Sequence, residues 1–586
     1  MAAQPTDNYP LDQMIDVAAG RTRSDLVLKN ASVVNVFSGD IVEGDVAIHQ
    51  GYIAGIGKYV GNKTVDLKGK YVVPSFFDGH VHVESSMVMP LQYARAVVPH
   101  GTGAVVADPH EIANVLGLEG IMYMSKSMRG GPLEFYIMLP SCVPSTDLET
   151  NGVALDFLDI KPLLSEHYVL GLAEAMNYPG VVFRDPDILE KIRVTLSTGK
   201  RIDGHAPDLA GMELNAYAAA RITSEHECYT LEEAQAKLAV GMHIHIREGS
   251  TAKNLKALAP LIQPHTSLLC SFVTDDRNTL DLLERGHIDS LIRDAVSYGV
   301  DAVQAIQVAT ISTARHYGLQ YRGAIAPGYH ADIAVIDDLK DINVESVYKS
   351  GEMVASKGKL IWEIGEHEQP RLRRSVNITW LDPEDFQVKA RGDRMNVIGI
   401  IPDQIITEHL VEETRIEDGL AMPDVDRDIA KIAIIERHNA SDVTGIGFVK
   451  GLGIKEGAMV SSIAHDSHNI VAVATNDRDL IAAAVQIVRM QGGLAIVRDE
   501  KVIASLPLPI AGLMSDQPIE VVSEKIQELK DAAKTIGSTL NEPFMTMAFL
   551  SLPVIPKLKI TDRGLVDVDR FRFIDLFDTP KTEDKK

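Results

Sequence analysis

Residues 73–90 read VPSFFDGHVHVESSMVMP, and this segment is the strongest indication of the fold. Its centre holds His80 and His82, separated by a single valine. Alternate residues of a β-strand point to the same face, so both imidazoles can point at one spot while Val81 and Val83 face the opposite side. A His-x-His pair at a strand end suits a divalent metal ion, although a lone pair also occurs as an ordinary polar strand end.

The chain after this stretch alternates short apolar strands with longer helical segments as far as about residue 320. We predict eight strands, the first of which ends at His82. The other seven are 101–108, 134–140, 169–175, 201–205, 221–227, 241–248 and 267–276. Eight strand–helix units in about 250 residues are what a (β/α)8 barrel requires. The fold class is therefore predicted to be α/β, with the barrel at residues 74–320.

The segments on either side of the barrel contain short β-branched runs separated by glycine-containing turns. Each segment is too short to form a core alone, so we predict one composite β-sandwich from residues 24–73, read as an antiparallel meander, and 321–375. Residues 1–23 are predicted to be an N-terminal extension.

Residues 376–586 have a different texture and are predicted to form an additional α+β C-terminal domain, with extended segments at 396–402 and 431–438. One helix should begin at Asn476 or Asp477 and stop at Gly492–Gly493. Its expected apolar stripe is Leu480, Ala484, Val485 and Val488. The last eight residues, TPKTEDKK, are predicted to be a disordered tail.

Composition limits the partners. The formal net charge is −24 for 586 residues, which argues against nucleic acid or an anionic membrane as the main partner. The cysteines are Cys142, Cys228 and Cys270, without a C-x-x-C motif, so neither a disulfide framework nor a thiolate zinc site is expected. No leader-like segment and no apolar run of about 18 residues stands out, which predicts a cytoplasmic protein.

Polar residues gather at the ends of the predicted strands, where barrels of this type carry their chemistry. In chain order they are His80, His82, Asp108, His110, Glu174, His205, His226 and Asp275. Imidazole and carboxylate ligands without thiolate suit zinc, manganese or iron and do not choose among them. Glu174 lies in the apolar run LGLAEAM, where a carboxylate is costly unless a metal ion or a buried salt bridge meets it.

These motifs resemble the amidohydrolase superfamily and, within it, most closely the bacterial adenine deaminase family. The segments that carry the resemblance are HVHVESSM (80–87), VADPHEIANVLG (106–117), LAEAMN (172–177), DGHAP (203–207), SEHE (224–227), HIREGS (245–250), VTDDR (273–277) and SSIAHDSHNIVAV (461–473). The last segment lies in the predicted C-terminal domain, so the resemblance covers nearly the whole chain.

The resemblance implies a binuclear centre with two ions per chain, manganese by preference and iron or zinc as alternatives. The ligands would be His80, His82 and Asp275 for one ion, His205 and His226 for the other, and Glu174 as the bridge. The implied reaction is the hydrolytic deamination of adenine to hypoxanthine and ammonia, a step of purine salvage, in which a metal-activated hydroxide attacks C6.

The same residues suggest a proton shuttle, an acid for N1 and a set of substrate-binding side chains. Asp275 is the expected proton shuttle, with Asp276 as the alternative, because only one of two consecutive residues should face inward. Candidates for the acid that protonates N1 are Glu225, Glu227 and Glu248. Candidates for substrate binding are Asp108, His110, Arg247 and His465.

Two other activities stay open from the sequence: deacetylation of an N-acetyl amino sugar phosphate and deamination of an N6-substituted adenine. The deacetylases generally lack a large domain after the returning sandwich, which counts against the first. A metal-free scaffold is disfavoured because every expected histidine is present. The predicted partner is a small purine base, and a homodimer is expected.

Overall fold

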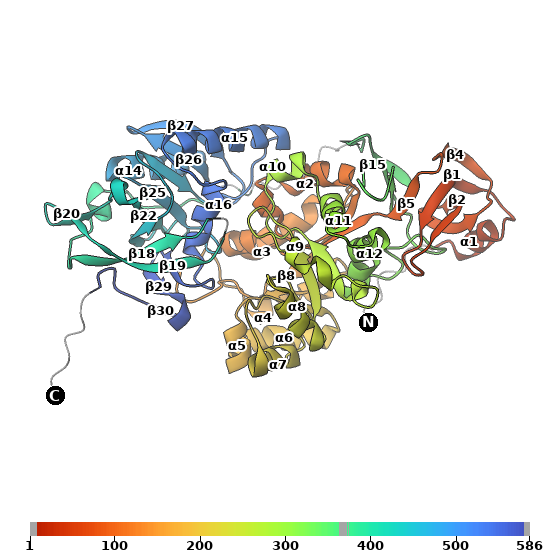
Figure 1. The fold of residues 1–586 in the computed structure, drawn as a ribbon, viewed down its shortest axis with the longest axis horizontal. Helices are drawn as coiled ribbons and strands as arrows, with labels where there is room; N and C mark the ends of the chain where they lie inside the picture. Colours follow the sequence, from red (N-terminus) through yellow and green to blue (C-terminus); the bar gives the residue numbers. More distant parts are fainter. Residues whose placement is uncertain (1–8, 363–371, 373, 403, 579–586) are drawn as a thin grey trace.

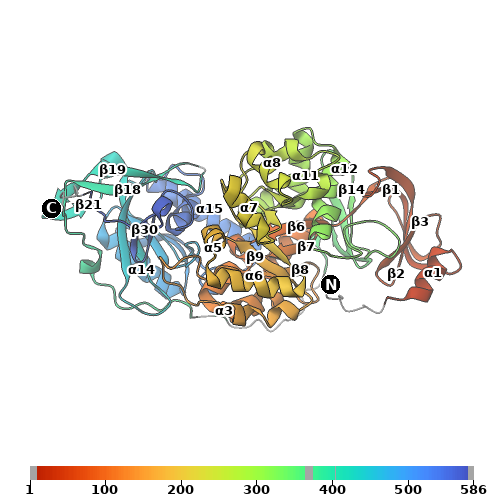
Figure 2. The same ribbon diagram turned by 90° about the horizontal axis from the view of Figure 1, so that it is seen from below.

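The computed structural model describes residues 9–362, 372, 374–402 and 404–578. The molecule is elongated, with three parts in a row (Figure 1). A β-sheet domain lies at one end, a barrel wrapped by helices lies in the middle, and a sheet-rich C-terminal domain lies at the other end, as the turned view also shows (Figure 2). The predicted tail at 579–586 lies outside the described residues.

The central part is a barrel of parallel strands. Five strands pair in the order β6-β7-β8-β9-β10, and three pair in the order β11-β12-β13. Their bounds are Phe76–Val81, Thr102–Ala107, Glu134–Leu139, Val169–Ala175, Arg201–Gly204, Ser224–Glu225, His243–Arg247 and Cys270–Val273. The predicted (β/α)8 fold is confirmed, and each strand falls within its predicted range.

Backbone hydrogen bonds close the barrel at both gaps between these two sheets. The amide of Asp275 donates to the carbonyl of His80, and the amide of His82 donates to the carbonyl of Asp275, each at 3.1 Å. On the other side, the amide of Thr223 donates to the carbonyl of Ile202 at 2.8 Å. The first seam therefore brings the last strand of the barrel beside the His-x-His pair of the first.

The barrel strands are covered on the outside by helices, which is why β6 and β9 are buried along their whole length. Most of the covering helices lie around the centre of the molecule (Figure 1). They are α2 (Pro90–Val97), α3 (His110–Ser127), α4 (Phe157–Ile160), α5 (Tyr178–Phe183), α6 (Pro186–Thr198), α7 (Gly211–Ala219), α8 (Leu231–Ala239), α9 (Leu255–Leu258), α10 (Thr279–Glu284), α11 (Ile288–Ser297), α12 (Ala302–Gln307) and α13 (Thr313–His316).

The sheet at the N-terminal end combines two segments of the chain. The strands are β1 (Ser24–Val34), β2 (Ile41–His49), β3 (Tyr52–Gly57), β4 (Gly61–Asp66), β5 (Tyr71–Pro74), β14 (Ile333–Ile336), β15 (Val344–Lys349), β16 (Glu352–Ser356) and β17 (Lys359–Leu360). The segments meet where β14 pairs antiparallel with β5. A short helix, α1 (Leu11–Ala18), precedes β1.

The expectation of a purely antiparallel meander in the first segment is wrong. Strands β4 and β5 both pair with β1 in parallel, β4 along its first half and β5 along its second half. The physical reason is that β2 already occupies one edge of β1, so the chain returns past the β2–β3 hairpin to the other edge.

The C-terminal domain is built on a sheet of eight strands in the order β19-β18-β23-β22-β25-β24-β26-β27. Their bounds are β18 Arg394–Ile400, β19 Thr407–Glu413, β22 Ile429–Ile435, β23 Thr444–Lys450, β24 Ala458–Ser461, β25 Ile470–Ala474, β26 Gly493–Arg498 and β27 Lys501–Pro507. Smaller sheets hold β20 (Arg415–Glu417) with β21 (Leu420–Met422), and β28 (Leu558–Thr561) with β29 (Gly564–Asp567) and β30 (Arg572–Phe573). The other main helices are α15 (Ile519–Thr535) and α16 (Pro543–Ala548).

The predicted helix of this domain is α14 (Asp477–Met490). The side chain of Asn476 caps it by accepting from the amide of Asp479 at 2.9 Å. Its buried apolar stripe is Leu480, Ala483, Ala484 and Ile487, whereas Val485 and Val488 are half-buried. The expected stripe was therefore partly wrong, because the sheet lies against a face rotated toward Ala483 and Ile487.

The C-terminal domain packs on the end of the barrel where the strands finish. The amide of Ser515 donates to the carbonyl of Met87 at 2.8 Å, and the side chain of Asn469 donates to the carbonyl of Thr150 at 2.8 Å. In addition, His465 and His468 of the loop between β24 and β25 bond Glu111 at the start of α3. None of the helices in the described ranges has the length and apolar character that a membrane span requires.

Candidate metal centre and substrate pocket

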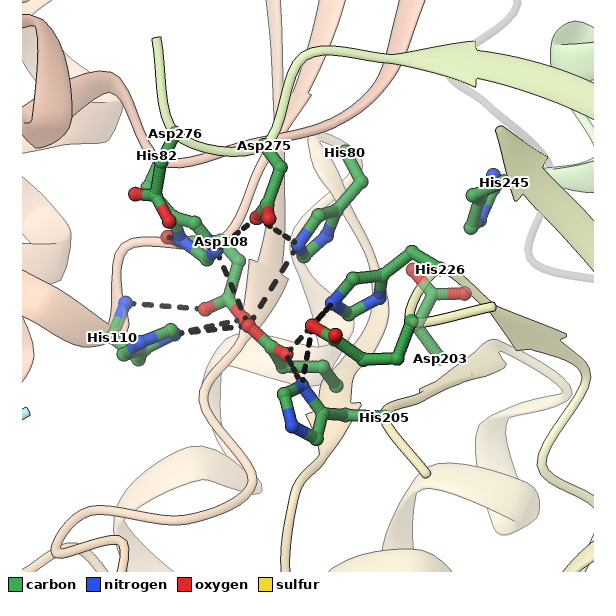
Figure 3. Close-up of polar contacts among 12 residues, drawn as sticks. His80, His82, Asp108, His110, Asp203, His205, His226, His245, Asp275 and Asp276 are labelled. Carbon is green, nitrogen blue, oxygen red and sulfur yellow. Dashed lines mark hydrogen bonds and ion pairs between the residues drawn. The ribbon is translucent and has the colours of Figure 1, made fainter. Parts of the chain in front are cut away.

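The six predicted metal ligands come together at the C-terminal ends of the barrel strands. His80 and Glu174 lie on β6 and β9, and the others directly follow the ends of β6, β10 and β11 or lie just beyond β13. All six are buried. Figure 3 shows the rings of His80, His82, His205 and His226 turned toward a common centre, with Asp275 beside them.

Glu174 stands between two groups of ligand atoms. Its Oε1 lies 3.3 Å from His82 Nε2 and 3.7 Å from His80 Nε2. Its Oε2 lies 3.2 Å from His226 Nε2 and 2.7 Å from His205 Nδ1. Ligand atoms that share one tetrahedral ion, with bonds of about 2.0–2.2 Å, lie about 3.3–3.6 Å apart. Three of these distances are close to that spacing, and the contact with His205 is a hydrogen bond. Glu174 thus lies between two groups of potential ligands, where its carboxylate would bridge two bound ions.

Asp275 completes the first group. Its Oδ1 lies 3.1 Å from His82 Nε2 and 3.4 Å from His80 Nε2. Its Oδ2 accepts from the guanidinium of Arg247 at 2.9 Å. One carboxylate oxygen thus faces the histidines while the other is fixed, so the side chain has a defined orientation.

The hydrogen-bond pattern fits metal ions at these positions. The carbonyl of Asp108 can only accept, so His82 Nδ1, at 3.0 Å, carries the proton and Nε2 keeps its lone pair toward the site. His80 Nε2 and Asp275 Oδ1 are buried and have no hydrogen-bond partner among the described residues. Each such atom costs about 1–3 kcal/mol unless a partner offsets it, and a bound cation is that partner.

The electrostatics favour positive charge at the same place. Burial lowers the pKa of His82, but the carboxylates of Asp275 and Glu174 outweigh burial and raise this pKa well above its ordinary value. The site therefore stabilises a cation beside these carboxylates, as a metal centre must.

The structure does not bring two of the three candidate acids to the pocket. The carboxylate of Glu225 accepts from the amides of Ala206 and Glu227 and pairs with Lys237 at 3.0 Å, between the barrel and helix α8. Glu248 accepts from the amide of Leu255 at 3.1 Å and does not line the pocket. Both assignments are corrected for the same reason, since each carboxylate faces away from the barrel mouth.

Glu227 lies in the pocket instead. Its Oε1 is 3.3 Å from His226 Nε2 and 3.5 Å from His205 Nδ1, and both of its oxygens accept from Arg247. Burial raises the pKa of Glu227, but Arg247 and the histidines outweigh burial, so the pKa lies well below its ordinary value. Glu227 is therefore held as a carboxylate.

Three of the four predicted substrate-binding residues line the pocket, namely His110, Arg247 and His465. Asp108 lies behind them, where its Oδ1 accepts from the amide of His110 at 3.1 Å and its Oδ2 lies 3.1 Å from His110 Nδ1. Asp108 thus positions His110 and does not itself line the pocket.

The C-terminal domain supplies one wall of the pocket, of which the sequence predicted His465 but none of the apolar residues. Its contributions to the pocket are Ile405, His465, Asp466, Phe549, Leu552 and Ile555. The ring of His465 stacks on Phe549 with centroids 4.4 Å apart. The sign that the sequence offers is the three-residue spacing of Phe549, Leu552 and Ile555 in an apolar run.

Comparison with known proteins agrees with this architecture. Residues 71–354 match the amidohydrolase family, and residues 404–572 match the adenine deaminase C-terminal domain. Adenine deaminase 2 of Carboxydothermus hydrogenoformans is 48% identical over 96% of this chain and 99% of its own length. The adenine deaminase of Desulfatibacillum aliphaticivorans is 47% identical over 97% of this chain and 100% of its own, and that of Dehalococcoides mccartyi is 47% identical over 96% and 99%. The chain therefore belongs to the adenine deaminase family of the amidohydrolase superfamily.

Proposed function

We propose that this protein catalyses the hydrolytic deamination of adenine to hypoxanthine and ammonia. The observation that carries the proposal is that identity to adenine deaminases extends through both the barrel and the C-terminal domain that walls the pocket. The deacetylase alternative is not favoured, because the relatives named above are adenine deaminases along nearly their full length.

The residues fit a pair of divalent ions, held by His80, His82 and Asp275 on one side, by His205 and His226 on the other, and bridged by Glu174. Bound ions would supply the nucleophile by lowering the pKa of a water molecule. Manganese, with iron or zinc as alternatives, is proposed from the family resemblance.

Asp275 is placed to move the proton that the reaction requires. Its Oδ1 faces the histidine pair and its Oδ2 is fixed by Arg247, so the carboxylate can accept a proton from the attacking water and pass it to the leaving amine. Asp276 also lines the pocket, but its Oδ1 accepts from the hydroxyl of Ser85, and among the described residues it forms no hydrogen bond or ion pair with the histidine pair.

The purine ring would lie between apolar and polar walls of the pocket. Met176, Phe549 and Leu552 offer apolar surface to a flat ring, and His110 and His465 offer polar atoms to its edges. Since the C-terminal domain covers the barrel mouth, the bound base would be shielded from bulk water during the reaction.

Two carboxyl groups of the pocket are candidates for the acid that protonates N1. Among the pocket carboxyl groups that are not proposed metal ligands, Glu227 is paired with Arg247, and Glu111 is paired with His465 and His468. The remaining candidates are Asp276 and Asp466. Burial raises the pKa of Asp466 to about 6, so this group keeps its proton at a higher pH than an exposed aspartic acid. We propose Asp466 as the first candidate to test.

A substrate panel with metal analysis tests the function. Ammonia release should be fastest with adenine and far slower with adenosine, guanine and cytosine. N6-Methyladenine would release methylamine, so its turnover is followed as hypoxanthine formation and should also be far slower. N-acetylglucosamine 6-phosphate should release no acetate. Faster turnover of N6-methyladenine than of adenine would reassign the substrate. Acetate release without ammonia release would reject the proposal. The homodimer, the cytoplasmic location and the role in purine salvage stay predictions.

A further inference from the structure

A second polar cluster lies inside the barrel below the metal ligands, and the proposed reaction does not use it. Strand β12 carries His243, His245 and Arg247 on one face and two isoleucines on the other. The isoleucines pack in the apolar core outside the strand, so the three polar side chains point into the barrel. Barrel interiors of this fold are normally filled by branched apolar side chains. The presence of His243 and His245 in the barrel interior therefore requires an explanation.

Three side chains from separate elements meet in this interior. They are Asp203 on β10, His245 on β12 and His316 at the end of α13. One ring nitrogen of each histidine and one oxygen of Asp203 lie within 4.8 Å of one another. His316 Nε2 is 3.5 Å from Asp203 Oδ1, close to the spacing expected of two ligands on one tetrahedral ion. Figure 3 draws Asp203 and His245 to one side of His226, away from His82 and His110.

The cluster is buried and incompletely hydrogen-bonded. Asp203 and His245 are each 1% exposed, and His316 is 8% exposed. His245 Nδ1 and His316 Nε2 have no hydrogen-bond partner within the described part of the chain. One oxygen of Asp203 accepts from the hydroxyl of Ser224 at 2.6 Å. The other lies 2.7 Å from the hydroxyl of Tyr317, whose single hydrogen is shared between Asp203 and the carbonyl of Gly79. These neutral donors hold the carboxylate in place but do not balance its charge.

A buried carboxylate without a positive partner is costly. Among the described residues, Asp203 has no lysine or arginine partner, and its contact with His316 is an ion pair only when that imidazole is protonated. His245 Nε2 lies 3.3 Å from the hydroxyl of Tyr317. A divalent cation would balance the charge of Asp203 and accept a nitrogen lone pair from each histidine.

Another candidate cluster among the described residues, formed by Glu111, His465 and His468, differs in this respect. His465 and His468 each bond one oxygen of Glu111, so both carboxylate oxygens already have partners. That cluster is complete as an ion pair, whereas the cluster of Asp203, His245 and His316 is not.

We propose that Asp203, His245 and His316 bind a third divalent cation that is structural and separate from the proposed catalytic pair. Two imidazoles and one carboxylate suit zinc or a similar borderline metal ion. The ion would tie β10, β12 and α13 together beneath the reaction site, and it does not depend on which substrate the enzyme takes.

Metal counting on the full-length protein tests the proposal. The purified protein is incubated with excess Zn²⁺, passed through a desalting column and analysed by mass spectrometry of the metal. The wild type should retain three zinc ions per chain, and the His316→Gln variant should retain two. The matched control is His243→Gln, because the His243 ring stacks on His316 at 4.3 Å but its Nε2 bonds Ser271. This control should retain three.

Two zinc ions in the wild type, or three in His316→Gln, would overturn the proposal. A wild-type crystal gives a readout that no folding defect of a variant can affect. An anomalous difference map at the zinc edge should show a peak in contact with Asp203, His245 and His316. A map with peaks at the Glu174 centre but none at this position would equally overturn it.

Discussion

His465 Nδ1 lies 2.7 Å from Glu111 Oε1, so the C-terminal domain and the first turn of barrel helix α3 share a buried ion pair beside the pocket. His468, from the same loop, bonds the other oxygen of Glu111. In most barrels of this type the βα loops alone build the site. Here a distant domain contributes to the site itself, and its effect on catalysis can be measured.

Replacing His465 by alanine should weaken substrate binding. The substitution removes the ring that stacks on Phe549 and pairs with Glu111, so two pocket walls lose their connection. We expect KM for adenine to rise about three- to tenfold, or kcat to fall by a similar factor, with metal content unchanged. Steady-state kinetics decide the matter. The control His409→Ala, on β19 and outside the pocket, should behave as wild type. Equal kinetics for the His465→Ala and His409→Ala variants would show that His465 only packs against its neighbours and does not contribute to substrate binding or catalysis.

The same ion pair should make stability depend on pH. Burial lowers the pKa of His465, but Glu111 outweighs burial and raises this pKa to about 9. Because the folded-state pKa is above the ordinary value, the stabilisation is fully present below about pH 6.5 and is lost as pH rises through about 9. A shift of this size corresponds to at most about 3 kcal/mol.

Comparing the Tm of the wild type with that of Glu111→Gln measures this effect. The difference should be largest at pH 6.5 and should shrink at pH 9.5, provided that unfolding is scanned at one rate. The matched variant His409→Ala should show no such trend. A difference between wild type and Glu111→Gln that stays constant over this range would show that His465 is neutral in the folded protein.

The sequence was enough to predict that the six proposed metal ligands lie together, because the barrel topology brings the strand ends to one place. Parallel strands of a closed barrel finish at one end, so residues at eight strand ends converge although they lie far apart in the chain. Glu174 could be identified because a carboxylate within a buried strand needs a positive partner. Neither inference required knowledge of how the three domains pack.

The wrong choice of Glu225 and Glu248 as candidates for the acid that protonates N1 also has a simple cause. Side chains alternate along a strand, so Glu225 must face away from the site if its neighbour His226 faces into it, and Glu248 must face away from Arg247. The structure shows this arrangement, with Glu225 paired to Lys237 of the covering helix. Strand alternation does not apply to Glu227, because this residue follows the end of β11, where the chain turns. The spacing of Phe549 and Leu552 indicates an apolar face, but their place in the pocket depends on how the C-terminal domain docks on the barrel, which a local pattern does not show.

Glu174→Gln should disable the metal centre while the fold survives. The amide keeps the size of the side chain but carries no charge and presents only one oxygen, so it cannot bridge two cations. We expect fewer than two ions per chain and a fall in turnover of at least about 100-fold, with the circular dichroism spectrum unchanged. Glu248→Gln is the matched control, since its carboxylate bonds Leu255 outside the pocket, and it should stay within a few-fold of wild type. A Glu174→Gln enzyme with two ions and full activity would refute the bridging role.

Asp275→Asn should lose most of kcat even at saturating adenine. The carboxylate faces His80 and His82 through one oxygen and Arg247 through the other, and an amide can neither accept the proton nor hold a cation as well. We expect a loss of at least about 1000-fold, measured as ammonia release with metal content determined in parallel. Asp276→Asn is the comparison, because Asp276 bonds Ser85 and is adjacent in the chain. The activity of Asp276→Asn should fall by a smaller factor, and the change should mainly be a higher KM if Asp276 only shapes the pocket. An inactive Asp276→Asn beside a healthy Asp275→Asn would transfer the proton shuttle to Asp276.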